Sequence, residues 1–138
     1  MLRRFAPVVV VVLAATACGG SHSGDEKAIR AVVNGFLQAY ADGDVQKACS
    51  KLAAEGRRSL FSAANEAACE RTVRKQSQNA RPRDRTRLRS AFVVRVKFTS
   101  KNTARAYIKF PTFDAPAAPL RVRKIGTRWL ILGPPKGG

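Results

Sequence analysis

Side chains able to do covalent, acid–base or metal chemistry are few in this chain of 138 residues. The cysteines are Cys18, Cys49 and Cys69, and the single histidine is His22. A tetrahedral metal site needs several such ligands brought together, and this set does not supply them. A cysteine nucleophile would also lack a histidine partner in the region expected to fold. The sequence therefore predicts neither a metal site nor a cofactor.

The remaining candidates for acid–base chemistry are Tyr40, Asp42 and Asp44. The two aspartates flank Gly43, where one helix is expected to end and the next to begin, and capping explains them. Tyr40 occupies an apolar position of the first expected helix, so it belongs in the core or at the wall of a pocket. Because no two titratable groups can share the acid and base roles, we predict no catalytic residue. An enzyme is kept as the less favoured alternative.

Cys18 directly follows an uncharged, valine-rich segment that is typical of an export signal. This segment, residues 5–17, is shorter than the ~20 residues that a membrane-spanning helix needs. It ends in Ala-Thr-Ala, which fits a secretory cleavage site and, together with Cys18, resembles a bacterial lipobox. We therefore predict a signal peptide over residues 1–17 and a lipidated Cys18 that anchors the protein to the outer face of the bacterial cell membrane. Secretion without a lipid is the alternative.

Lipidation of Cys18 would leave an even pair, Cys49 and Cys69. Residues 18–24 are rich in glycine and serine and are expected to form a flexible tether. The two remaining cysteines occupy apolar helical positions in a compartment that permits oxidation, so we expect them to form a disulfide. Two buried free thiols are the alternative.

Apolar residues at helical spacing predict a first helix from Asp25, ended by Gly43. A second helix is expected to begin with Asp44 as its cap, and a third to begin at Asn65. The inward positions expected in these helices are Ile29, Val32, Val33, Phe36, Leu37, Tyr40, Val45, Ala48, Cys49, Leu52, Ala68, Cys69 and Val73.

After Pro82 the apolar residues alternate, which predicts about four antiparallel strands. Helices followed by strands are typical of an α+β domain in which about three helices cover one face of a curved sheet. We expect this domain to span residues 25–132, followed by a disordered tail over residues 133–138. In the first strand, the side chains expected on the inner face are Leu88, Phe92, Val94, Val96 and Phe98.

Three short features resemble the small exported lipoproteins of the NTF2-like superfamily, with its SnoaL-like cone fold. They are the turn Ala41–Asp44, the cysteine pair in the helices that follow, and the closing hairpin at residues 126–132. The resemblance implies a cone whose interior is either filled or open to an apolar ligand, and whose relatives include cyclases and isomerases. The candidate lining residues are Phe36, Tyr40, Phe92, Val94, Ala106, Ile108 and Trp129.

Lysine and arginine number 26 against 9 acidic residues, which gives a formal net charge of +17. Much of the excess is expected on the sheet face away from the helices, at Arg87, Arg89, Arg95, Lys97, Arg105, Lys109, Arg121, Arg123 and Arg128. For an exported protein, anionic lipids or envelope polyanions fit such a face better than nucleic acid. Arginine-rich codon usage is the alternative explanation. A face of one charge should also disfavour pairing of two sheets, so we expect a monomer.

Overall fold

The computed structural model describes residues 22–111 and 114–136, so the expected signal peptide and Cys18 lie outside the described residues. Five helices precede a four-stranded antiparallel sheet whose strands are ordered as they are in the chain. The elements are α1 Ser23–Asp42, α2 Val45–Ser50, α3 Ala54–Phe61, α4 Glu66–Asn79, α5 Pro82–Ser90, β1 Phe92–Phe98, β2 Thr103–Lys109, β3 Ala118–Ile125 and β4 Arg128–Gly133.

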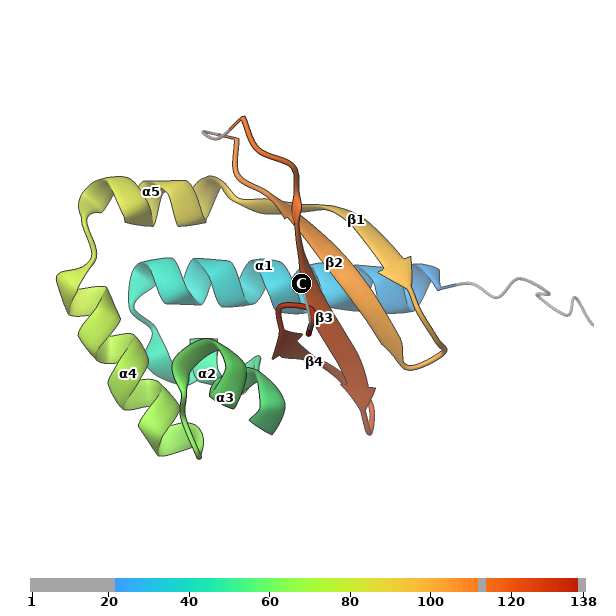
Figure 1. Cartoon of the computed structure of the whole chain (residues 1–138), viewed down its shortest axis with the longest axis horizontal. Helices are drawn as coiled ribbons and strands as arrows, with labels where there is room; N and C mark the ends of the chain where they lie inside the picture. Colours follow the sequence, from blue (N-terminus) through green and yellow to red (C-terminus); the bar gives the residue numbers. More distant parts are fainter. Residues whose placement is uncertain (1–21, 112–113, 137–138) are drawn as a thin grey trace, which may run out of the picture.

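The expected α+β class is confirmed, and the long helix α1 is its central element (Figure 1). One half of α1 lies against the sheet, where it contacts β1 and β4, and its other half lies among α2, α4 and α5. Ile29 and Val33 on α1 are fully buried, as are Val122 and Ile131 on the strands. The core therefore lies between α1 and the inner face of the sheet.

Local capping signals position the helices that the sequence predicted. Gly43 ends α1 with a left-handed φ of 73°, and the Asp44 side chain accepts a hydrogen bond from the Lys47 backbone N–H at the start of α2. Asn65 does the same for α4 by accepting from the Ala68 N–H. These side chains satisfy backbone donors that have no partner within the helix.

Cys49 on α2 and Cys69 on α4 are both fully buried, and their Cα atoms are 6.0 Å apart. Their sulfur atoms lie at disulfide-bonding distance, which is consistent with the expected crosslink. The pair joins two helices that pack side by side (Figure 1).

The expectation of about three helices was wrong, because the structure adds α3 and α5. In α3 the one fully buried residue is Gly56, where a Cβ would collide with the Ile131 carbonyl oxygen. This helix therefore packs its backbone against β4 and shows no apolar stripe. Leu88 and its neighbours Arg87 and Arg89 had been assigned to the first strand, but they belong to α5. Pro82 stands at the first helical position, and arginine itself favours helix.

The inner face of β1 also differs from the expectation, because a β-bulge interrupts its pairing with β2. Val93 pairs with Ile108 but Arg95 pairs with Tyr107, so one extra residue, Val94, lies between the two pairs. Such an insertion turns the side chains before it to the opposite face. Phe92 and Val94 are consequently 45% and 42% exposed, and neither lines the interior as expected.

Both ends of the domain extend further than the expected limits. The His22 ring stacks on Phe98 with the ring centroids 3.9 Å apart, and α1 already begins at Ser23, within the expected tether. At the other end, Gly133 belongs to β4, and Lys136 forms an ion pair with Glu55. Residues 133–136 of the expected tail therefore contact the domain.

The carboxylate of Asp25 fastens the start of α1 to the sheet. It accepts hydrogen bonds from Trp129 Nε1 at 3.0 Å and from Lys124 Nζ at 3.2 Å. The Trp129 hydrogen bond, followed by the Lys124 hydrogen bond, lowers the pKa of Asp25 below its ordinary value. The charged form of this carboxylate is thus the form that the fold favours.

Candidate functional site: a basic sheet face

The outer face of the sheet, away from α1, carries much of the expected charge. Six of the nine predicted basic residues alternate with inward-facing residues on β1, β2 and β3. They are Arg95, Lys97, Arg105, Lys109, Arg121 and Arg123. We call these six residues the basic face.

The other three predicted members lie elsewhere, which corrects the expectation. Arg87 and Arg89 belong to α5, and Arg89 forms an ion pair with Asp42 on α1. Arg128 is on β4, but its guanidinium reaches the Ser50 carbonyl oxygen in α2. The strand assignment of Arg87 and Arg89 failed because the residues before β1 form the helix α5.

Within the basic face, three cations stand in one row across three strands. Lys97 on β1 pairs with Arg105 on β2, and Arg105 pairs with Arg121 on β3. Directly opposite residues in an antiparallel sheet have Cβ atoms about 5 Å apart, and like charges in these positions destabilise the sheet. The fold thus holds three positive charges side by side against their mutual repulsion.

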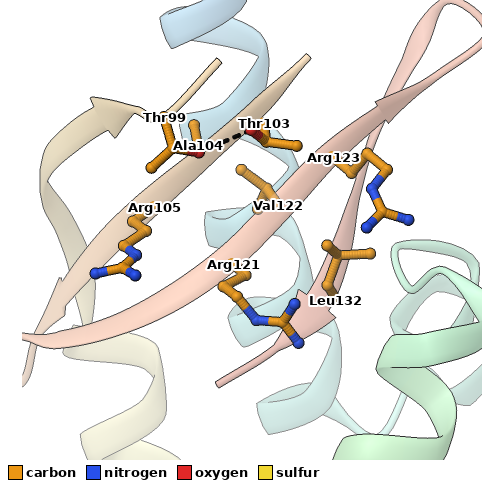
Figure 2. A pocket seen from close by; sticks show the side chains of 8 residues that line it. All are labelled: Thr99, Thr103, Ala104, Arg105, Arg121, Val122, Arg123 and Leu132. Atoms are coloured by element: carbon orange, nitrogen blue, oxygen red, sulfur yellow. Dashed lines mark hydrogen bonds between the residues drawn. The ribbon is translucent and has the colours of Figure 1, made fainter. Parts of the chain in front are cut away.

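A hollow of about 250 Å³ lies beside two members of this row, Arg105 and Arg121 (Figure 2). Arginine side chains from the neighbouring strands β2 and β3 stand around it in Figure 2, and two threonines lie at its upper edge. Its lining residues are Thr99, Thr103, Ala104, Arg105, Arg121, Val122, Arg123 and Leu132. We call this hollow the arginine pocket.

The threonine hydroxyls form a small network at the edge of the arginine pocket. Thr103 Oγ1 lies 2.7 Å from Thr99 Oγ1 and 2.6 Å from Ser100 Oγ. If both neighbours donate to Thr103, its own hydroxyl proton is free to be donated elsewhere. Thr103 also pairs across the sheet with Arg123, so this hydroxyl and that guanidinium belong to adjacent strands.

A single carboxylate, Glu55 on α3, compensates one side of the arginine pocket. Its Oε1 accepts from Arg121 at 3.0 Å and lies 3.1 Å from Lys136 Nζ, and its Oε2 lies 3.9 Å from Arg123. The Arg121 hydrogen bond is the largest cause that lowers the pKa of Glu55, ahead of that from Lys136. Arg121 in the wall of the pocket is therefore already bound to a carboxylate of its own chain.

The rest of the basic face is left without a counter-charge. Among the described residues, Lys97 and Arg105 have neither a side-chain hydrogen bond nor an ion pair. Arg95 lies over the Tyr107 ring, 4.2 Å from its centroid, and Lys109 donates to the Ala115 carbonyl oxygen. Such a surface can bind an anion from solution.

Most of the residues predicted to line an interior pocket do not line one in the structure. Ala106, Ile108 and Trp129 are buried in the packed core. Only Phe36 and Tyr40 line an open hollow, of about 270 Å³ among the helices α1, α3, α4 and α5. The other residues around this hollow are Leu37, Leu60, Phe61, Gln76 and Leu88.

Tyr40 is the one titratable group in this aromatic hollow. Its hydroxyl donates to Gln76 Oε1, its ring stacks with Phe61, and burial raises its pKa. A tyrosine with a raised pKa keeps its proton near neutral pH and has no base beside it here. The hollow thus has the character of an apolar binding site and lacks a pair of groups for acid–base catalysis.

The sequence analysis missed Glu55, Thr99 and Thr103. Nothing in the sequence distinguishes Glu55 from the other acids, and its partner Arg121 is 66 residues away. Only the packing of α3 against β4 brings the two together, and α3 carries no helix signal that could be recognised from the residues alone.

Within residues 22–111 and 114–136, no helix is long and apolar enough to cross a membrane, and no three potential metal ligands form a group. No protein-family model matches the chain, and no curated protein is found to be similar to it.

Proposed function

We propose that this protein is an exported, lipid-anchored and non-catalytic envelope protein of the NTF2-like superfamily, and that its basic face binds anionic lipid headgroups. The observation that carries the proposal is the row of Lys97, Arg105 and Arg121 on the exposed side of the sheet. Only Arg121 of the three has a carboxylate partner. An arrangement that costs stability and leaves two of its three cations without a counter-charge is expected where a surface serves a ligand.

The position of His22 supports the membrane as the source of that ligand. His22 stacks on Phe98, at the end of β1 from which the hairpin to Thr103 continues. Cys18 precedes His22 by four residues, which span at most about 14 Å when extended. A lipid on Cys18 would therefore hold this end of the sheet within about two Debye lengths of the headgroups.

The free energy available from such a contact is sufficient to keep a tethered domain on the membrane surface. Each basic residue near an anionic surface contributes about 1 kcal/mol, and the basic face has several such residues. The tether raises the effective concentration, so a weak contact is occupied for much of the time.

Two experiments test the proposal. Cells given a labelled fatty acid should label the protein, and Cys18→Ala should abolish the label; mature protein in the medium without label would contradict anchoring. For the surface, the mature chain carrying Cys18→Ser should bind anionic vesicles, should ignore neutral ones, and should be released by salt.

A matched pair of variants then identifies the face. Changing Arg95, Lys97 and Arg105 to glutamate should abolish vesicle binding. The same change of charge at Arg71, Arg74 and Arg83, which are exposed on α4 and α5, should have a much smaller effect. Equal losses in both variants would mean that only net charge matters and that the basic face has no particular role.

A second candidate function is the binding of a small apolar molecule in the aromatic hollow around Phe36, Tyr40 and Phe61. Its support is the size of the hollow, about 270 Å³, and its mostly apolar lining. Enlarging Leu88 to tryptophan, at its edge, should block uptake of a fluorescent apolar probe if this function holds.

A further inference from the structure

We propose that the arginine pocket is a binding site for a phosphate group, and that Glu55 is an internal competitor for it. This inference deepens the proposed function, on which it rests for the lipid as the source of the phosphate. The site itself is defined by the residues around the pocket, so it can be tested separately.

The arrangement of donors around the pocket suits a phosphate. Arg105 and Arg121 face each other on β2 and β3, and Arg123 lies two residues further along β3. Guanidinium groups bind the oxygens of phosphate in a bidentate manner, which makes arginine the usual residue for such sites. Thr103 adds a hydroxyl, which can donate its proton to a ligand when Thr99 and Ser100 donate to it.

The floor of the pocket is formed by the sheet itself. Ala104 and Val122 belong to the buried core and turn their side chains inward, so strand backbone lies under the pocket there, and Leu132 beside them is 2% exposed. An anion on this floor would be shielded from water on one side, so its attraction to the guanidiniums would be stronger than on an open surface.

The contacts of Glu55 show that the arginines of the pocket bind anionic oxygens, because its carboxylate already binds Arg121 and lies near Arg123. A phosphate that approaches the same two guanidiniums must displace or share them with this carboxylate. Phosphate carries up to two negative charges and three acceptor oxygens, and Arg105 is available to it in addition. Glu55 therefore lowers the affinity of the site and makes it selective for the more highly charged anion.

The first arm of the experiment uses inorganic phosphate with the mature chain carrying Cys18→Ser. Phosphate should raise the melting temperature more than chloride at equal ionic strength, and titration should give a saturable affinity. Arg105→Thr should lower that affinity by about tenfold, the usual effect of losing a charge-assisted hydrogen bond. Glu55→Gln should raise it several-fold, and Arg83→Thr on α5 should leave it unchanged.

The second arm compares vesicles that contain phosphatidic acid with vesicles of equal surface charge that contain phosphatidylserine. Preference for phosphatidic acid, lost in Arg105→Thr, would identify the lipid phosphate as the ligand. Saturable phosphate binding without vesicle binding would retain the site and contradict the proposed membrane function.

The proposal would be overturned if phosphate and chloride had the same effect on the wild-type chain. It would also be overturned if Glu55→Gln left phosphate affinity unchanged or weakened it. If in either case vesicle binding still depended on the basic face, the proposed function would stand without a phosphate site.

Discussion

Arg105 on β2 lies directly opposite Arg121 on β3, and only Arg121 of the two has a carboxylate partner, Glu55. Lys97 flanks Arg105 on its other side. Arg105 is thus the middle member of a row of three cations, and it bears the repulsion of both neighbours.

The first prediction is that Arg105→Thr stabilises the protein. Threonine favours strands, and its introduction removes two like-charge contacts, each worth about 0.2–1 kcal/mol. Urea unfolding at low salt should show a free energy of unfolding higher by roughly 1 kcal/mol, and the gain should shrink as salt screens the charges. Arg83→Thr, exposed on α5, is the control and should give no gain. A loss of stability in Arg105→Thr would mean that the arginine stem packs more favourably than its charge repels.

The second prediction concerns Cys49 and Cys69. Non-reducing mass spectrometry of the exported protein should find their two peptides crosslinked. Replacing both by alanine should lower the free energy of unfolding by about 3 kcal/mol, since the crosslink restricts a loop of 20 residues in the unfolded chain. Cys18→Ala should leave that free energy unchanged. Ready alkylation of both thiols in the native protein would contradict the crosslink.

The third prediction is an acid-sensitive stability that depends on Asp25 and Glu55. Both have a pKa below the ordinary values of 3.8 and 4.5, so their contributions are present above those values. Stability should be lost as the pH falls below them and through the lower pKa values of the folded protein, because the unfolded state binds more protons there. Melting temperatures from pH 7 down to pH 2 measure this loss.

An amide variant isolates the contribution of Asp25 to the acid sensitivity. Asp25→Asn should lower stability at pH 7 and flatten the acid part of the curve, because Trp129 and Lys124 would lose their charged acceptor. Asp114→Asn, exposed in the loop before β3, should leave the curve unchanged. A curve of wild-type shape in Asp25→Asn would assign the acid sensitivity to other groups.

The sequence predicted the elements whose signals are local. Asp44 and Asn65 cap helices within three residues of themselves, and Gly43 supplies the left-handed turn, so these boundaries could be recognised without the fold. The sheet and its outward cations could be predicted because apolar and basic residues alternate along the strands after the bulge.

The features that the sequence could not predict depend on contacts across the chain. Phe92, Val93 and Val94 are all apolar, so alternation alone fits either face, and the pairing with β2 decides the position of the bulge. Glu55 reaches Arg121 only because α3 packs on β4. The arginine pocket therefore combines a predictable set of cations with an unpredictable carboxylate.

The fourth prediction tests how α3 positions that carboxylate. A Cβ at Gly56 would collide with the Ile131 carbonyl oxygen of β4. This backbone atom cannot move away as easily as the end of a flexible side chain can. Gly56→Ala should therefore lower the free energy of unfolding by about 1–3 kcal/mol, even though alanine favours helix. Gly24→Ala on α1, where nothing lies within 4 Å, is the matched control and should not lower it. Urea unfolding measures both changes. If Gly56→Ala lowered the free energy of unfolding no more than Gly24→Ala does, the close contact between α3 and β4 that brings Glu55 to Arg121 would be refuted.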